Sequence, residues 1–111
     1  MNEKRHEAAR LLRALGHFYS RYGQHDRALE LLRLAEHLLP DNVGVQRSLA
    51  QALLLAGRPE GALAAIERLK HLEPAVPPAL RLLESRALWM LGQAGRARRA
   101  FMDYVEQRGP P

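Results

Sequence analysis

A pattern of small and apolar residues recurs along this chain about every 34 residues. One copy spans residues 9–42 and consists of two apolar helical patterns joined by a short turn. A shift of 34 residues, and then of 35, brings glycine onto glycine and alanine onto alanine. The matched sets are Gly23, Gly57 and Gly92; Ala28, Ala62 and Ala97; and Leu32, Ile66 and Phe101. A period of this length is typical of stacked helical repeats.

The first copy predicts how each hairpin is built. Gly16 and Ala28 are small, as is needed where two helix backbones come close. Gly23 can adopt the left-handed conformation that ends a helix, and Asp26 is expected to cap the helix that follows. Pro40 stops that second helix, because proline lacks the backbone donor and clashes with the preceding turn. We therefore expect a single all-α domain over residues 1–111, with hairpins at about 9–42, 43–76 and 78–108.

Composition narrows the class of protein further. The chain of 111 residues has no cysteine, which excludes disulfides and thiolate metal sites. Residues 1–8 continue an amphipathic helix and do not form an apolar leader, so no secretion signal is expected. The longest apolar run, 52–56, is too short to span a membrane. The net charge of +5 is compatible with nucleic acid, an acidic protein partner, or solubility alone.

No arrangement of residues in the sequence predicts catalysis or metal binding. The five histidines show no paired spacing suited to a zinc helix, and no glycine-rich phosphate loop is present. Glu84 is the one carboxylate close to a core position, and we expect it to pair with Arg81 or Arg98 in preference to a catalytic role. The sequence therefore predicts a non-enzyme without cofactor or metal.

The offsets of the repeat resemble those of the tetratricopeptide repeat (TPR), which has apolar and small residues at matching positions in two helices and a proline after them. The resemblance implies three hairpins stacked in a right-handed superhelical solenoid, with the first helix of each hairpin lining a concave groove. No separate capping helix follows the third hairpin. We therefore expect a second interface on its last helix, at Phe101, Tyr104 and Val105, covered by a partner or by a second copy.

The residues opposite each core stripe match the ligand-facing offsets of the TPR family. They predict a groove that is basic at its N-terminal end and apolar at its C-terminal end. Trp89 is its expected anchor, with core packing between helices as the alternative. The predicted groove residues are Arg10, Arg13, His17, Arg21, Arg47, Gln51, Leu54, Leu55, Leu82, Arg86, Trp89 and Met90.

Within the TPR family, the last third of the chain is similar to the Y-class chaperones of bacterial type III secretion (SctY, also called YscY). The matching segments are Ser85-Arg86-Ala87, Leu91-Gly92, Arg96-Ala97-Arg98, Ala100-Phe101 and Tyr104-Val105-Glu106. The resemblance implies a binding protein of the bacterial cytoplasm that associates with the inner-membrane export apparatus. Its implied partners are the small secreted X-class protein (SctX) and the export gate protein (SctV).

Three other interpretations stay open at the level of the sequence. The chain could be a general TPR protein-interaction module, or one that only self-associates. It could also be a nucleic-acid-associated helical repeat, as the charge and Arg96, Arg98 and Arg99 suggest. That third interpretation is weaker, because no aromatic stacking platform accompanies the basic face.

Overall fold

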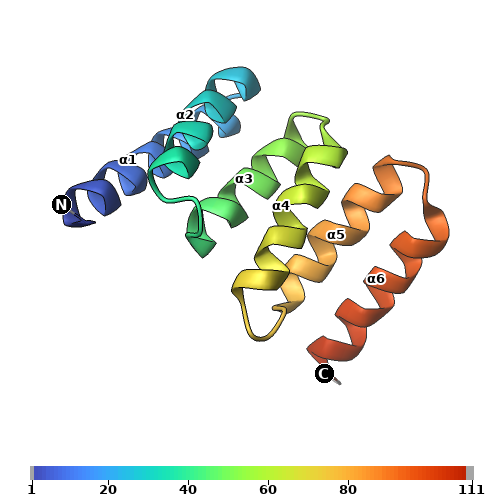
Figure 1. Ribbon diagram of the computed structural model, residues 1–111. Coiled ribbons are helices and arrows are strands. Elements are labelled where there is room, and N and C mark those ends of the chain that lie inside the picture. The colour runs from blue at the N-terminus through green and yellow to red at the C-terminus, as the bar shows by residue number, and fades with distance from the viewer. Residues whose placement is uncertain (1, 110–111) are drawn as a thin grey trace.

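The computed structural model describes residues 2–109, which form an array of α-helices with no strand among them (Figure 1). The prediction of an all-α fold is confirmed. The six helices are α1 (Asn2–Arg21), α2 (His25–Leu38), α3 (Val43–Leu55), α4 (Pro59–Leu72), α5 (Pro78–Met90) and α6 (Ala94–Arg108).

The helices stack as three consecutive hairpins. Each odd-numbered helix packs along the even-numbered helix that follows it, and α2 and α4 also pack on the first helix of the next hairpin. In addition, α1 contacts α3, and α3 contacts α5. The result is an elongated solenoid of 42 × 29 × 25 Å, with α1 at one end and α6 at the other (Figure 1). The odd-numbered helices therefore share one continuous layer.

The three hairpin turns use the same helix cap. The turn glycines Gly23, Gly57 and Gly92 have φ of +77°, +75° and +76°, in the left-handed region that glycine adopts without steric cost. In the first turn, Gly23 N–H donates to Ser20 O at 3.1 Å and Gln24 N–H donates to Tyr19 O at 2.9 Å. The other two turns repeat this pair of bonds. It is the Schellman motif, which satisfies the last carbonyl groups of the helix.

Two local predictions about helix starts are wrong. Asp26 does not cap α2, because the helix already begins at His25 and its N-cap residue is Gln24. Asp26 lies instead in the first turn, 3.4 Å from the guanidinium of Arg58. Gly95, which as a glycine near Gly92 could be expected in the last turn, is within α6. In contrast, α3 does have a side-chain cap: Asn42 Oδ1 accepts a hydrogen bond from Val45 N at 3.0 Å.

The core runs along the inside of the stack and excludes water almost completely at its centre. Its largest fully buried apolar side chains are Leu32, Leu49, Leu53, Ile66 and Leu69. Gly16 shows how closely α1 and α2 approach. A Cβ atom at this position would lie 2.9 Å from Leu32 Cγ, so a side chain there would displace Leu32. The predicted close contact at Gly16 is thus confirmed.

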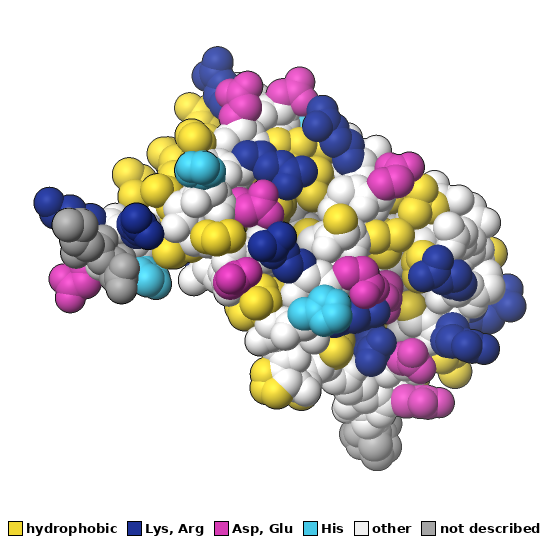
Figure 2. All heavy atoms as spheres, in the orientation of Figure 1, with side chains coloured by type: hydrophobic (Ala, Val, Ile, Leu, Met, Phe, Trp, Pro, Cys, Tyr) yellow, Lys and Arg dark blue, Asp and Glu magenta, His cyan; other side chains and the backbone are white. Residues whose placement is uncertain are grey.

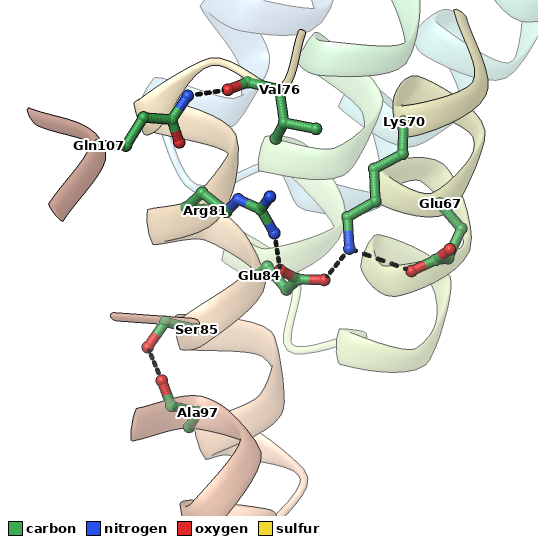
Figure 3. A network of polar contacts seen from close by, with 8 residues as sticks. All are labelled: Glu67, Lys70, Val76, Arg81, Glu84, Ser85, Ala97 and Gln107. Carbon is green, nitrogen blue, oxygen red and sulfur yellow. Dashed lines mark hydrogen bonds and ion pairs between the residues drawn. The ribbon is translucent and has the colours of Figure 1, made fainter. Parts of the chain in front are cut away.

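A polar network joins the last three helices (Figure 3). Glu84 of α5 is only 7% exposed, and its carboxylate pairs with Lys70 of α4 and lies 3.8 Å from Arg81. The predicted pairing with Arg81 is confirmed, whereas Arg98 is not a partner of Glu84 in the described residues. Ser85 Oγ donates to the Ala97 carbonyl at 2.8 Å, which ties α5 to α6. Polar contacts therefore support the apolar packing of the third hairpin.

Candidate functional site

The predicted groove lies on the layer of odd-numbered helices. Because α1 contacts α3 and α3 contacts α5, residues 34 or 35 positions apart form rows across this layer. One such row contains His17, Gln51 and Arg86, and all three side chains are exposed. Of the twelve predicted groove residues, all except Leu54 reach the surface.

Leu54 was assigned wrongly to the groove. Its side chain is 5% exposed and belongs to the same buried cluster as Ala87 of α5. Trp89 occupies the corresponding position one hairpin later and is 68% exposed. The difference arises because α5 covers that side of α3, whereas no odd-numbered helix follows α5 within residues 2–109. Trp89 therefore lies at the open C-terminal edge of the groove, where the next helix of a longer stack would pack, and it is not a core residue.

The C-terminal end of the groove is apolar, as its sequence indicates. Besides Trp89, Met90 and Leu55 are 46% and 47% exposed, and Leu82 is half-buried. Large apolar side chains grouped on an exposed face, with Arg86 beside them, are typical of the anchor region of a protein interface.

A small pocket opens between α1 and α3. It has a volume of about 140 Å³, and four of the predicted residues line it: His17, Arg21, Gln51 and Leu55. Pockets that hold small-molecule ligands are usually larger, about 300–1,000 Å³. The size of this pocket fits a single side chain of a bound peptide better than it fits a cofactor.

The basic end of the groove is less free than predicted. Arg13 Nε donates to Ser48 Oγ at 3.2 Å, and the guanidinium group of Arg47 forms an ion pair with Glu73. Arg13 thus bridges the first two hairpins, whereas Arg47 joins the two helices of the second hairpin. Three other predicted groove arginines have no ion-pair or hydrogen-bond partner within residues 2–109, namely Arg10, Arg21 and Arg86. These three are available to a carboxylate of a partner.

The proposed second interface lies on the last helix of the stack. Phe101 and Val105 are 44% and 43% exposed, and Tyr104 is half-buried with its ring centre 5.9 Å from that of Phe101. The corresponding residues of α4, Ile66 and Lys70, are covered or partly covered because α5 packs on that side. The C-terminal end of the described stack therefore presents an uncovered apolar face.

One exposed surface was missed at the level of the sequence. Apolar residues of α1 that lie opposite its arginines form a row of exposed side chains, here named the α1 stripe: Leu11, Leu15, Phe18 and Tyr22. The sequence signal for it is the row of apolar residues itself, spaced by three and four positions. The corresponding residues of α3 face the first hairpin, whereas those of α1 are not covered by another described helix.

The described part of the chain, residues 2–109, contains no group of three or more side chains suited to holding a metal ion. Over the same residues, no helix has both the length and the apolar character required to cross a membrane.

A family model described as "Tetratricopeptide repeat" matches residues 19–85, which is more than half of the chain. The chain belongs to the tetratricopeptide repeat family. No curated protein matches it significantly. As an all-α TPR solenoid, the protein is a protein–protein interaction module, and TPR proteins typically bind partners without catalysing reactions. The match ends before α6, so the third hairpin is assigned to the repeat array by its packing and turn geometry.

Proposed function

We propose that this TPR protein is a type III secretion chaperone and adaptor. In this proposal its groove binds and stabilises the small secreted X-class protein (SctX) and helps to present it to the export gate protein (SctV). It acts in the bacterial cytoplasm, next to the inner-membrane export apparatus, as one domain made of the three hairpins. The sequence similarity of residues 85–106 to Y-class chaperones supports this choice of partner.

The exposure of Trp89 is the observation that carries the proposal. Tryptophan buries a large apolar surface when a partner covers it, and exposed tryptophans are enriched among the residues that dominate binding energy. Trp89 is 68% exposed, and the next residue of α5, Met90, is 46% exposed. An amphipathic helix of the partner can lay its apolar side along these residues, in the helix-in-groove mode of recognition.

The charges of the groove determine which helix fits best. Arg10, Arg21 and Arg86 can each hold a carboxylate with two hydrogen bonds, because the guanidinium group is a planar fork of donors. We therefore expect the partner helix to carry Asp or Glu beside its apolar stripe. The nucleic-acid alternative rests on Arg96, Arg98 and Arg99 of α6, which lie exposed. Arg96 is already hydrogen-bonded to Gln93 at 2.6 Å, and exposed arginines without an aromatic stacking platform are no specific sign of nucleic-acid binding.

The test is calorimetric titration of the X-class partner into wild-type protein and into Trp89→Ala. We expect the variant to bind at least about 2 kcal/mol more weakly, which is about 30-fold in Kd. Leu34→Ala is the matched control, because Leu34 is 55% exposed but lies on α2, outside the groove. Circular dichroism melts of both variants show whether the fold is kept.

Two results would contradict the proposal in different ways. Normal binding by a folded Trp89→Ala would mean that the groove is not the binding surface. Failure of the folded wild-type protein to bind the X-class partner would rule out the type III assignment. In that second case the groove would remain the surface of an interaction module with a different partner.

A further inference from the structure

Helices α1, α3 and α5 each have a face at the position of the α1 stripe. In the described stack, that face is exposed only in α1. Its members Leu11, Leu15 and Phe18 are 60%, 38% and 52% exposed. The residues 34 positions later are Val45, Leu49 and Ala52, which are 0%, 1% and 4% exposed. Those 69 positions later are Leu80, Glu84 and Ala87, at 2%, 7% and 0%. In α3 and α5 this face is covered by the preceding hairpin.

Hydrophobic side chains consequently gather at the N-terminal end of the molecule. Figure 2 shows them over the first hairpin, at the upper left of the view, whereas charges of both signs are spread over much of the remaining visible surface. The aromatic members of the stripe also support each other, since the ring centres of Phe18 and Tyr22 are 4.8 Å apart. The stripe is thus a preformed apolar surface and not a set of scattered exposed residues.

The spacing of the stripe is that of a coiled-coil seam. Its four members are separated by four, three and four residues, and Ala8 continues the row three residues earlier. Apolar residues at alternating spacings of three and four are the pattern by which one helix packs along another. One edge of the seam carries Glu7, Ala14 and Arg21, seven residues apart and all exposed.

We propose that the α1 stripe is a dimer interface, in which the α1 helices of two copies pack against each other in antiparallel orientation. A two-fold axis near Ala14 brings Glu7 of each copy beside Arg21 of the other, so the dimer gains two pairs of opposite charges. It also sets the large ring of Phe18 across from the small Ala8. A parallel, in-register arrangement would place Glu7 beside Leu12 of the other copy, five residues later, and would form no pair between Glu7 and Arg21.

The large side chains of the α1 stripe make it unsuited to end-to-end stacking, in which the last hairpin of one copy would pack on the first hairpin of another. The repeat positions that hold Phe18 and Tyr22 in α1 hold Ala52 and Ala56 in α3. Small residues allow the close approach seen between hairpins inside the stack, and two aromatic rings prevent it. A symmetric pair of helices can instead interleave its large and small residues along the seam.

The dimer surface and the proposed groove meet only at Arg21. Arg10, Arg13 and His17, which line the groove from α1, lie on another side of the helix. The inference is therefore independent of the proposed partner. Phe18→Glu should leave partner binding unchanged, and Trp89→Ala should leave the dimer unchanged.

Sedimentation equilibrium over a range of concentrations tests the dimer. We expect wild-type protein to form dimers and Phe18→Glu to dissociate, with a dimer Kd at least about 30-fold higher, because a charge would replace an aromatic ring at the centre of the interface. Phe101→Glu is the matched control, since it makes the same change at an exposed phenylalanine of α6. Circular dichroism melts of both variants monitor folding.

Engineered cysteines test the orientation, because the natural chain has none. In an antiparallel pair, Ala14→Cys forms a disulfide with its own copy. Glu7→Cys and Arg21→Cys form one only when the two variants are mixed. In a parallel pair the two copies of each edge position lie on opposite sides of the seam, so none of the three variants would cross-link.

Several outcomes overturn the inference. Wild-type protein that stays monomeric at every concentration has no such interface. A dimer disrupted by Phe101→Glu but not by Phe18→Glu is held by the C-terminal end of the stack. If hydrogen exchange in α1 slows only when the X-class partner is bound, the α1 stripe is a binding surface for that partner and not a dimer interface.

Discussion

Glu84 shows how a single residue can depart from a repeat and still be accommodated by it. The corresponding positions of the first two hairpins hold Leu15 and Leu49. A carboxylate that is 7% exposed loses most of its hydration, so its charge requires nearby cations. Lys70 and Arg81 supply them from α4 and α5. The carboxylate is therefore part of the structure of the third hairpin, and this accounts for it without a catalytic role.

Lys70→Met is expected to destabilise the protein by about 1–3 kcal/mol, because it leaves the buried Glu84 with only the more distant Arg81. The double variant Lys70→Met/Glu84→Leu should recover most of that loss, since two apolar side chains of similar size need no compensating charge. Urea unfolding monitored by circular dichroism measures these differences.

Glu67→Ala is the control for that measurement. Glu67 lies 3.4 Å from the same lysine, but its side chain is 60% exposed, so its removal should change stability by about 0.5 kcal/mol or less. A double variant no more stable than Lys70→Met would show that the cost does not come from the unpaired carboxylate.

At the scale of the helices, the first helices of the three hairpins end in the same way, but the helices differ in how they begin. Gly23, Gly57 and Gly92 end α1, α3 and α5 with the same left-handed cap. At the N-terminal ends, only α3 among helices α2 to α6 has a side chain that caps it, from Asn42. Helices α4 and α5 begin with a proline instead, whose fixed φ suits a first helical turn. Among α2 to α6, the N-terminal end of α3 is therefore the one that a single side chain stabilises by a capping hydrogen bond.

Asn42→Ala is expected to lower the free energy of unfolding by about 1 kcal/mol, because it removes the acceptor for Val45 N–H. Gln93→Ala is the matched control, since Gln93 occupies the same N-cap position of α6 without a side-chain bond. Chemical denaturation of the two variants gives the comparison. Equal losses would mean that the Asn42 bond contributes nothing specific to stability.

At the scale of the whole molecule, each hairpin contacts only its neighbours, so stability is not uniform along the stack. Helix α3 packs against α1, α2, α4 and α5, whereas α6 packs against α5 alone among the described helices. Its face at Phe101 and Val105 is open, as is the α1 stripe at the other end. Local opening should therefore begin at the ends and reach the middle hairpin last.

Hydrogen exchange followed by mass spectrometry measures this order. Peptides of α3 and α4 should exchange slowest, and those of α6 should exchange faster by a factor of at least about 10, because fewer buried contacts hold that helix closed. Binding of a partner or a second copy should slow exchange at the end that it covers. Equal protection of all six helices would instead indicate that the stack opens as a single cooperative unit.

Much of this molecule could be predicted from local patterns in the sequence. Helix and turn chemistry depends on residues close in the chain, so the recurring glycines and the 34-residue period were enough to place the hairpins. They also led to the prediction of a groove on the odd-numbered helices. The start of α2 was misplaced at Asp26, because several residues near the turn can begin a helix and local preferences differ little among them.

The sequence by itself determined which side of each helix is apolar, because that depends on a periodicity of 3.6 residues within one segment. Only the tertiary structure decided which of those apolar sides are buried. Leu54 and Trp89 hold the same position in successive hairpins, yet one is sealed and the other is open. The α1 stripe and the buried residues that correspond to it in α3 differ in the same way. Burial requires a second helix to occupy the facing space, and its presence is a property of the assembled stack that no single repeat encodes.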